Sequence, residues 1–474
     1  MKRIIAVLRW ALTLLALVAA PAGAAADPDA QVDAMMRRLM AERQIPGAQV
    51  AVVRNGRVVL LRHYGVANLQ TPVPVTDGTI FSINSITKAF TGIAAMREVE
   101  AGRLDLAKPV SAYLTGLPQA WRGVTVRQLL SHSSGLPDFA GTAGQRQGEG
   151  KPAWDLALTQ PVRFPAGERF DYSQTNYALV QNILNTLNGR PLDDPVVLAQ
   201  TALVGMPATG LHDGGDVVPG KAAAYAIGHE TPSGPAVPRG VFEVFAPKHR
   251  AASGLDSNAI DMARWMNAIL DGRLLGPAVL RTMWTRTAFN DGSLGQWGIG
   301  WLVRDRAAHR AVGMTGGSRA AMFLYPDDHV GVVVLTNLAG AAPEDLVDEI
   351  AALYIPGMQL EGVAALRAAL DSEGYGRASA TLARLRADPG FRVDEQELND
   401  WGYRLLSFGK PKEALAVMKI GIELFPRSGN AYDSLADAYA INGDKVRAIA
   451  GYERSLMLDP NNGNAVRRLK LLRE

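Results

Sequence analysis

The sequence of 474 residues contains no cysteine. This absence excludes disulfide bridges, thiolate nucleophiles, cysteine-ligated metals and a lipidated N-terminal cysteine. Aromatic residues account for 7% and charged residues for only 20%, whereas hydrophobic residues account for 48%. At roughly 150 residues per domain, this length and composition predict about three globular domains and exclude a disordered chain.

The sequence also lacks an N-terminal hydrophobic run long enough to cross a bilayer. The apolar stretch from Trp10 to Ala20 has 11 residues, whereas a spanning helix needs roughly 20. Three basic residues precede the stretch and five small residues follow it, at positions 22 to 26. Residues 1–26 therefore predict a secretory leader, cleaved after Ala24 or Ala26, rather than an uncleaved anchor. We expect export to the periplasm or the medium, with no membrane span left after cleavage.

The chain has no surplus of charge outside this leader. Lys and Arg total 49 and Asp and Glu total 46, but three of the basic residues and none of the acidic ones lie in residues 1–26. The remainder is formally neutral, which argues against a polyanionic partner such as nucleic acid. No phosphate-binding glycine loop is present, and the seven histidines show no metal-ligand spacing. We therefore expect neither nucleic acid, nor a metal, nor a cofactor.

Two pairs of strand-like runs stand far apart in the sequence. Residues 47–53 and 57–63 are joined by Asn55-Gly56, which is a strong hairpin signal. Residues 320–325 and 330–336 form a second pair around a short turn that contains proline and aspartate. The sequence therefore predicts a sheet that sequence-distant segments complete.

Helical patterns flank and separate these strands. Residues 32–41 have helical apolar spacing, and a second helix is expected to begin near Ser82 to Ser85 and to run to Ala101. Residues 104–238 are rich in proline and glycine, which favours helices and long loops over a regular sheet. Together the patterns predict an α/β (α+β) fold with a helical subdomain.

The last hundred or so residues repeat with a period of 34. A shift of that length aligns Gly409 with Gly443, Ala414 with Ala448, and Pro426 with Pro460. A helix-pair repeat of this period is similar to the tetratricopeptide repeat. A degenerate pair is expected at 363–385 and a capping helix at 464–472. We predict an all-α repeat domain over 357–474, which either binds a protein or peptide partner or is a packing appendage.

The segment Ser85-Ile86-Thr87-Lys88 has a spacing that carries chemistry. On a helix, positions i and i+3 share a face, so the lysine amine can reach the serine hydroxyl. Lys88 can act as a base only if its pKa falls from about 10.4. The alternative is a helix cap followed by a surface lysine. Ser407-Phe408-Gly409-Lys410 has the same spacing inside the repeats, where a turn lysine explains it.

Further blocks occur in a particular order along the chain, namely Ile45-Pro46-Gly47, Thr79 to Thr91, Leu129 to Pro137, Phe164 to Gly167, Tyr172 to Tyr177, Ala252 to Leu255, Trp297 to Trp301 and Gly313 to Gly317. In this order they resemble the serine beta-lactamase and penicillin-binding protein superfamily, closest to its class C-like hydrolases and esterases. The resemblance covers roughly Gln31 to Tyr354. It implies an antiparallel sheet flanked by helices, over a domain of residues 27–356.

The resemblance also implies roles for individual residues. Ser85 would attack as the nucleophile, while Lys88 and Tyr172 would move protons. Tyr172 would work as a phenolate, so its pKa of about 10 would have to be lowered by a nearby cation. The backbone amides of Ser85 and Gly317 would form the oxyanion hole.

The sequence departs from the family pattern at two positions. Gln174 stands where the second motif usually has asparagine, and Asn176 lies near enough to substitute for it. Met314 stands where the third motif usually has lysine or histidine, and it offers no charge to a substrate carboxylate. Arg319 either provides the missing cation or faces solvent. The positions expected to contact substrate are Gln174, Met314, Thr315, Gly316 and Arg319.

Two other nucleophile systems fit less well. The segment from Gly316 to Ala320 lacks the final glycine of a nucleophile elbow and precedes a strand. His132 is expected to be a structural loop residue rather than a triad base. The resemblance therefore predicts an exported serine hydrolase that forms an acyl-enzyme with small esters or with D-amino-acid amides and peptides. The alternative is a catalytically weakened binding or scaffold protein that acts through its repeats.

Overall fold

The computed structural model describes residues 27–140, 153–190, 199–212, 215–229, 236–244, 247–306 and 308–474. The predicted leader at residues 1–26 lies outside the described residues. No helix within the described ranges is both long enough and apolar enough to cross a membrane.

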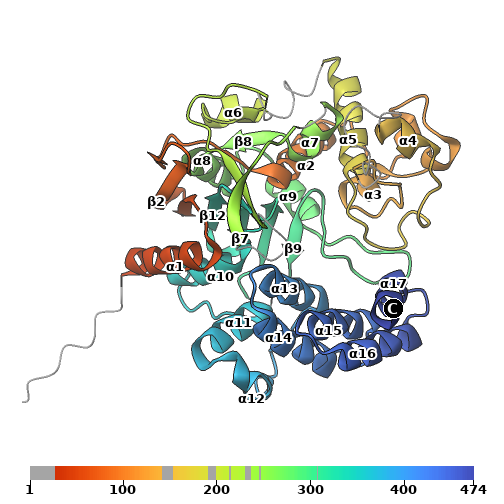
Figure 1. Ribbon diagram of the computed structural model, residues 1–474. Helices are drawn as coiled ribbons and strands as arrows, with labels where there is room; N and C mark the ends of the chain where they lie inside the picture. Colours follow the sequence, from red (N-terminus) through yellow and green to blue (C-terminus); the bar gives the residue numbers. More distant parts are fainter. Residues whose placement is uncertain are drawn as a thin grey trace, which may run out of the picture.

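A seven-stranded antiparallel sheet forms the centre of the fold (Figure 1). Its strands, in spatial order, are β3 (Val73–Pro74), β2 (Arg57–Asn68), β1 (Gly47–Arg54), β12 (Val330–Thr336), β11 (Ala320–Tyr325), β10 (Ala311–Gly316) and β9 (Leu302–Arg304). Both predicted hairpins are present. β1 pairs with β12 from Ala48 to Arg54, so sequence-distant strands complete the sheet as the sequence predicts.

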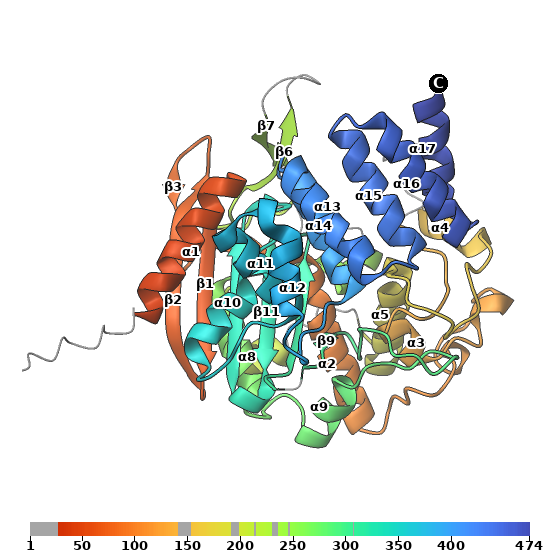
Figure 2. The same ribbon diagram turned by 90° about the horizontal axis from the view of Figure 1, so that it is seen from below.

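Both faces of this sheet are covered, which is why β12 is buried along its whole length and β1 is buried at every residue except Arg54. Along β11, Met322 and Leu324 point to one core and Phe323 and Tyr325 to the other, as the two-residue period of a strand requires. The first core lies against α2 (Thr87–Glu100) and α8 (Ala259–Leu270). The second lies against α1 (Pro28–Arg43) and α10 (Glu344–Tyr354), which Figure 2 shows in front of the strands.

Helices and short sheets surround the first core. The helices are α3 (Val126–Leu130), α4 (Ala153–Thr159), α5 (Gln174–Asn188), α6 (Ala199–Val204), α7 (Arg250–Ser253) and α9 (Pro277–Met283). One small sheet contains β4 (Phe81–Ser82), β8 (Leu255–Ser257) and β5 (Gly210–Leu211), and the other contains β13 (Leu338–Ala339), β6 (Ala224–His229) and β7 (Ala236–Val241). The β6–β7 hairpin differs from the sequence prediction, which favoured helices and long loops in this region. β6 pairs with β13, a strand more than a hundred residues later, so no local pattern indicates the hairpin.

The C-terminal region is helical throughout its described elements. It contains α11 (Gly362–Glu373), α12 (Ala378–Leu385), α13 (Glu395–Ser407), α14 (Pro411–Leu424), α15 (Gly429–Ile441), α16 (Lys445–Leu458) and α17 (Gly463–Arg473). The bounds of α15 and α16 follow those of α13 and α14 by 34 residues at each of the four ends. Gly409 and Gly443 occupy the same left-handed turn in the two helix pairs. The sequence period is therefore a period of structure.

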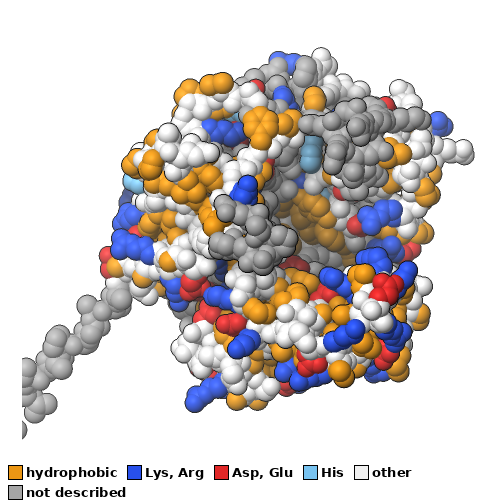
Figure 3. All heavy atoms as spheres, in the orientation of Figure 1, with side chains coloured by type: hydrophobic (Ala, Val, Ile, Leu, Met, Phe, Trp, Pro, Cys, Tyr) orange, Lys and Arg blue, Asp and Glu red, His pale blue; other side chains and the backbone are white. Residues whose placement is uncertain are grey.

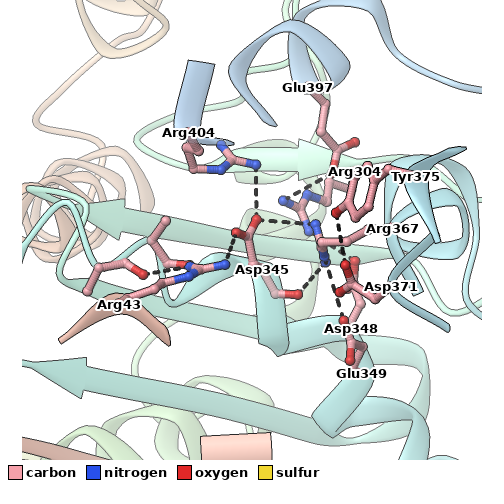
Figure 4. A network of polar contacts seen from close by, with 12 residues as sticks. Arg43, Arg304, Asp345, Asp348, Glu349, Arg367, Asp371, Tyr375, Glu397 and Arg404 are labelled. Atoms are coloured by element: carbon pink, nitrogen blue, oxygen red, sulfur yellow. Dashed lines mark hydrogen bonds and ion pairs between the residues drawn. The ribbon is translucent and has the colours of Figure 1, made fainter. Parts of the chain in front are cut away.

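The helical region is attached to the sheet part through a buried carboxylate. Asp345, at the start of α10, is 2% exposed and accepts hydrogen bonds from Arg43 of α1 at 2.8 Å and Arg404 of α13 at 3.0 Å. Arg367 of α11 binds the same carboxylate at 3.2 Å. Figure 4 shows these arginines converging on Asp345 from separate elements. Figure 3 shows that the face of the molecule is hollowed between the sheet part and the C-terminal helices.

Candidate active site

Ser85 lies in a short 3-10 turn, Asn84–Ile86, immediately before α2. The regular helix thus begins at Thr87, slightly later than predicted. Asn84 has a left-handed backbone with φ of 44°, a conformation that asparagine tolerates better than most residues. The Thr87 hydroxyl donates to the Asn84 carbonyl at 2.6 Å and accepts from the Leu255 amide at 3.1 Å. These contacts fix the turn against β8.

Lys88 lies one helical turn after Ser85, and its side chain is fully buried. Its Nζ lies 3.3 Å from Ser85 Oγ, and it donates to Gln174 Oε1 and to the Ala252 carbonyl, each at 2.9 Å. Burial lowers the pKa of Lys88 well below its usual value, against a weaker opposing effect of Asp138. No carboxylate forms an ion pair with it among the described residues, so the neutral amine is favoured.

Tyr172 reaches Ser85 from the segment that leads into α5. Its hydroxyl donates to Ser85 Oγ at 2.8 Å, and Lys88 Nζ lies 4.7 Å from the centroid of its ring. Burial raises the pKa of the Tyr172 phenol, and hydrogen bonds to Ser85 and Gln174 only partly offset this effect. The direction is opposite to the expected lowering by a cation, because the burial of the phenol itself outweighs its hydrogen bonds.

The two amides of the second motif have separate partners. Gln174 binds Lys88 through its side-chain oxygen, and its backbone amide donates to Asp138 at 2.9 Å. Asn176 is fully buried, and its side chain contacts Ser134 at 2.6 Å and His132 at 3.2 Å instead. Asn176 therefore does not substitute for Gln174 beside the lysine.

His132 packs against the ring of Tyr172. Its ring lies 4.4 Å from that of Tyr172, centroid to centroid, and its Nδ1 accepts the Ser173 amide proton at 3.1 Å. Burial, with a contribution from Lys88, lowers the pKa of His132 well below its usual value. The ring is therefore neutral at pH 7 and bears its proton on Nε2, which fits the structural role predicted for it.

The end of β10 approaches the turn that contains Ser85 so closely that only glycine fits at position 316. A Cβ on Gly316 would lie 2.0 Å from the Ile83 carbonyl oxygen and 3.1 Å from the Ser85 amide nitrogen. Gly317 has φ of 55°, and a Cβ there would lie 3.1 Å from the Asn84 side chain. The backbone at the end of β10 therefore lies beside the Ser85 amide.

Three of the five residues expected to meet the substrate, Met314, Gly316 and Arg319, are buried. Met314 is 2% exposed and belongs to the core against α2. Arg319 is 3% exposed, and its Nη1 lies 2.9 Å from Glu243 Oε2. Arg319 is thus neither a solvent residue nor an open cation. Thr315 and Gln174 remain partly exposed.

The sequence interpretation missed four contributors to this site. They are the Ala252 carbonyl that holds Lys88, the Asp138 carboxylate behind Gln174, the Trp297 ring beside Tyr172 and the Glu243 partner of Arg319. Ala252 and Trp297 belong to sequence blocks that resemble the family, but the sequence does not indicate which of their atoms contact Lys88 or Tyr172. Glu243 has no local signal, because its partners are distant in sequence.

Comparison with known proteins agrees with this geometry. The beta-lactamase family matches residues 32–355, more than half of the chain. The chain belongs to the beta-lactamase family, and the fold and its antiparallel sheet are those the sequence predicts.

Individual relatives fit the same assignment. A beta-lactamase of Providencia stuartii is 32% identical over 239 residues, covering 50% of this chain and 58% of that protein. The aligned part of the chain thus spans less than two thirds of that curated relative. An octameric penicillin-binding protein homologue from Pyrococcus abyssi has a TM-score of 0.58 at 25% identity, covering 69% of this chain and 77% of its own. A class C beta-lactamase, at 20% identity and a TM-score of 0.58 over 70% of this chain and 97% of its own, shares the fold.

Proposed function

We propose that the protein is an exported serine hydrolase that forms an acyl-enzyme at Ser85. One observation carries the proposal. Ser85 Oγ lies 2.8 Å from the Tyr172 hydroxyl and 3.3 Å from Nζ of a lysine that is fully buried. Serine is too weak an acid to attack a carbonyl unaided, and a neutral amine at this distance supplies the missing base.

The protonation states support a particular division of labour. Lys88, neutral because burial lowers its pKa, takes the Ser85 proton as the Oγ–carbon bond forms. Tyr172, protonated because burial raises its pKa, gives its proton to the leaving oxygen or nitrogen as that bond breaks. Lys88 then passes the proton it took from Ser85 to Tyr172. A water molecule next attacks the acyl-enzyme with the same proton transfers, and the acid leaves Ser85. The amides of Ser85 and Gly317 would stabilise the oxyanion, each worth about 2.7 to 4 kcal/mol.

The substrate class is small esters or D-amino-acid amides and peptides, by likeness to the family. The buried Met314 and the paired Arg319 argue against tight binding of a substrate carboxylate. A solved relative described as a hydrolase with promiscuous acyltransferase activity, at a TM-score of 0.57 and 22% identity, shares the fold only. Export through the leader at residues 1–26 belongs to the same proposal.

The apolar Met314 favours a second candidate, a binding or scaffold protein that acts through its C-terminal helices. In that case the 34-residue helix pairs, which we propose to be tetratricopeptide repeats of a separate domain at residues 357–474, would hold a protein or peptide partner. The intact set of Ser85, Lys88 and Tyr172 favours the hydrolase, because buried ionisable groups cost stability and give a scaffold no benefit.

Labelling with a fluorophosphonate probe, together with p-nitrophenyl ester hydrolysis, tests the proposal. Ser85→Ala should abolish both, whereas Ser407→Ala, the matched change in the second Ser-x-x-Lys segment, should alter neither. Labelling that persists in Ser85→Ala, or no turnover by the native chain, would contradict the hydrolase proposal and favour the scaffold protein. Nitrocefin should be cleaved far more slowly than the esters, and equal rates would contradict the argument from Met314.

A further inference from the structure

Glu243 contacts residues close in sequence to both expected oxyanion donors, Ser85 and Gly317. It follows strand β7, and its Oε2 binds Arg319 at 2.9 Å while its Oε1 accepts from Asn84 Nδ2 at 3.4 Å. Asn84 directly precedes Ser85, and Arg319 lies two residues after Gly317. The carboxylate therefore links the residue before Ser85 to the segment after Gly317, and 20% of the Glu243 side chain is exposed.

This pairing determines what Arg319 can offer a substrate. The guanidinium side chain is 4% exposed, and its Nε has no hydrogen-bond partner among the described residues. Glu243 is thus the one carboxylate that balances this buried charge within the described ranges. A substrate carboxylate arriving here would meet a neutralised cation and an adjacent negative charge.

Two described residues of the site offer no replacement cation. Met314, on the strand that leads to Gly317, is apolar and buried. Burial lowers the pKa of Lys88, so that amine is not a dependable positive charge either. Next to Glu243, the side chains of Phe242 and Val244 are 72% and 46% exposed. The described side chains on either side of Glu243 are therefore apolar, and the charge of Arg319 is balanced by Glu243.

We infer that Glu243 is a specificity-determining residue that excludes substrates bearing a carboxylate on the leaving group, and so restricts the site to uncharged esters and amides. The inference rests on the proposed hydrolase function and narrows its substrate class. Specificity of this kind comes from a repulsive group as much as from an attractive one.

A matched pair of aryl esters tests the inference. Both have the same phenylacetyl group, and their leaving groups are 3-carbamoylphenyl and 3-carboxyphenyl, which are alike in shape and differ in charge. We expect the native protein to hydrolyse the carbamoyl ester with a kcat/KM at least tenfold higher. Glu243→Gln frees the Arg319 charge, so the carbamoyl-to-carboxyl ratio should fall at least tenfold.

Three further variants complete the test. Glu243→Gln with Arg319→Gln removes both the repulsive carboxylate and the freed cation, so its ratio should lie between that of the native protein and that of Glu243→Gln. Arg319→Gln alone leaves the Glu243 charge unbalanced and should widen the preference, which keeps the test decisive if Glu243→Gln folds poorly. Glu453→Gln, an exposed carboxylate of α16 that pairs with Arg473, should leave both rates unchanged.

The outcomes separate this inference from the proposed function. A ratio that stays within twofold of the native value in Glu243→Gln and in Arg319→Gln overturns the role of Glu243 while the hydrolase stands. A native preference for the carboxyl ester overturns it as well. If neither ester shows Ser85-dependent turnover, the proposed function itself has failed.

Discussion

Two segments of this chain share a Ser-x-x-Lys spacing, and only one of them forms a chemical site. In the first, Lys88 is fully buried and its Nζ lies 3.3 Å from Ser85 Oγ. In the second, the Ser407 hydroxyl donates to the Arg404 carbonyl at 2.7 Å. Lys410 is 37% exposed and pairs with Glu42 at 2.9 Å. Equal spacing in the sequence has given opposite surroundings.

The backbone between the two residues explains the difference. Ser85 and Lys88 lie on one continuous turn that leads into α2, so both side chains point to one face. Between Ser407 and Lys410, Gly409 adopts a left-handed conformation with φ of 69° and ends α13. The spacing therefore becomes a contact only where the helix continues, and the contact becomes chemistry only where it is buried.

The largest effect that this comparison predicts is on turnover. Lys88→Met should lower kcat/KM for a p-nitrophenyl ester by about a thousandfold, within the ~10²–10⁴ range of a lost general base. Lys410→Met should leave kcat/KM unchanged. Steady-state kinetics on protein shown to be folded by circular dichroism measures both.

Lys88→Arg serves as a stricter variant, since it keeps the donors to Gln174 and Ala252 but cannot lose its proton near neutral pH. Loss of activity in this variant would assign the effect to proton transfer. Retained activity in both Lys88 variants would mean that Lys88, like Lys410, has no role in catalysis.

A smaller effect concerns how the two parts of the chain are joined. Lys410 joins them by an exposed pair, whereas Asp345 joins them from a buried position with three arginines. Asp345→Asn should lower the free energy of unfolding by about 3 kcal/mol, the lower end of the cost of breaking a buried ion pair. Urea unfolding monitored by tryptophan fluorescence measures it.

Asp305→Asn is the control, because that carboxylate is 50% exposed and lies 3.7 Å from Arg286. Burial alone would raise the pKa of Asp345, but Arg404, Arg367 and Arg43 together lower it below its usual value. The stabilisation is therefore present at neutral pH and is lost as pH falls through this lowered pKa, below the unfolded value of about 3.9. Equal losses for Asp345→Asn and Asp305→Asn would refute a special role for burial.

A third effect is the pH dependence of acylation. The neutral amine of Lys88 is the active form, so the rate should fall tenfold for each pH unit below its pKa. Because burial lowers that pKa from its usual value, the plateau should extend well below pH 10. Pre-steady-state release of p-nitrophenol between pH 5 and pH 10 provides the profile. A fall of about sevenfold already between pH 10 and pH 9, as a pKa of about 10.4 requires, would instead indicate an ordinary, solvated lysine.

Local pattern was enough to predict much of this molecule. Both hairpins of the main sheet, the helix after Ser85 and the 34-residue helix pairs depend on residues close together in sequence. The order of motifs also predicted that Ser85, Lys88 and Tyr172 would meet. Burial of Met314, by contrast, depends on how a strand packs against α2, which no local pattern reveals.

The remaining features depend on contacts between distant segments. Glu243 meets Arg319 across 76 residues, and Asp345 meets Arg43 across 302. The direction of the Tyr172 pKa shift also escaped prediction, because it follows from the depth of burial rather than from the nearby amine alone. Composition and spacing identify which groups exist, while the tertiary structure decides their charge.

The smallest predicted effect is that of the exposed pair itself. A double-mutant cycle with Glu42→Gln and Lys410→Met should give a coupling energy below about 0.5 kcal/mol, because solvent and side-chain entropy offset most of an exposed attraction. Both side chains are more than a third exposed, at 44% and 37%, and added salt should reduce the coupling further. The cycle is measured by urea unfolding of the two single variants, the double variant and the native chain. A coupling above about 1 kcal/mol would show that Lys410 holds the helical region in place, and the second Ser-x-x-Lys segment would then have a structural task of its own.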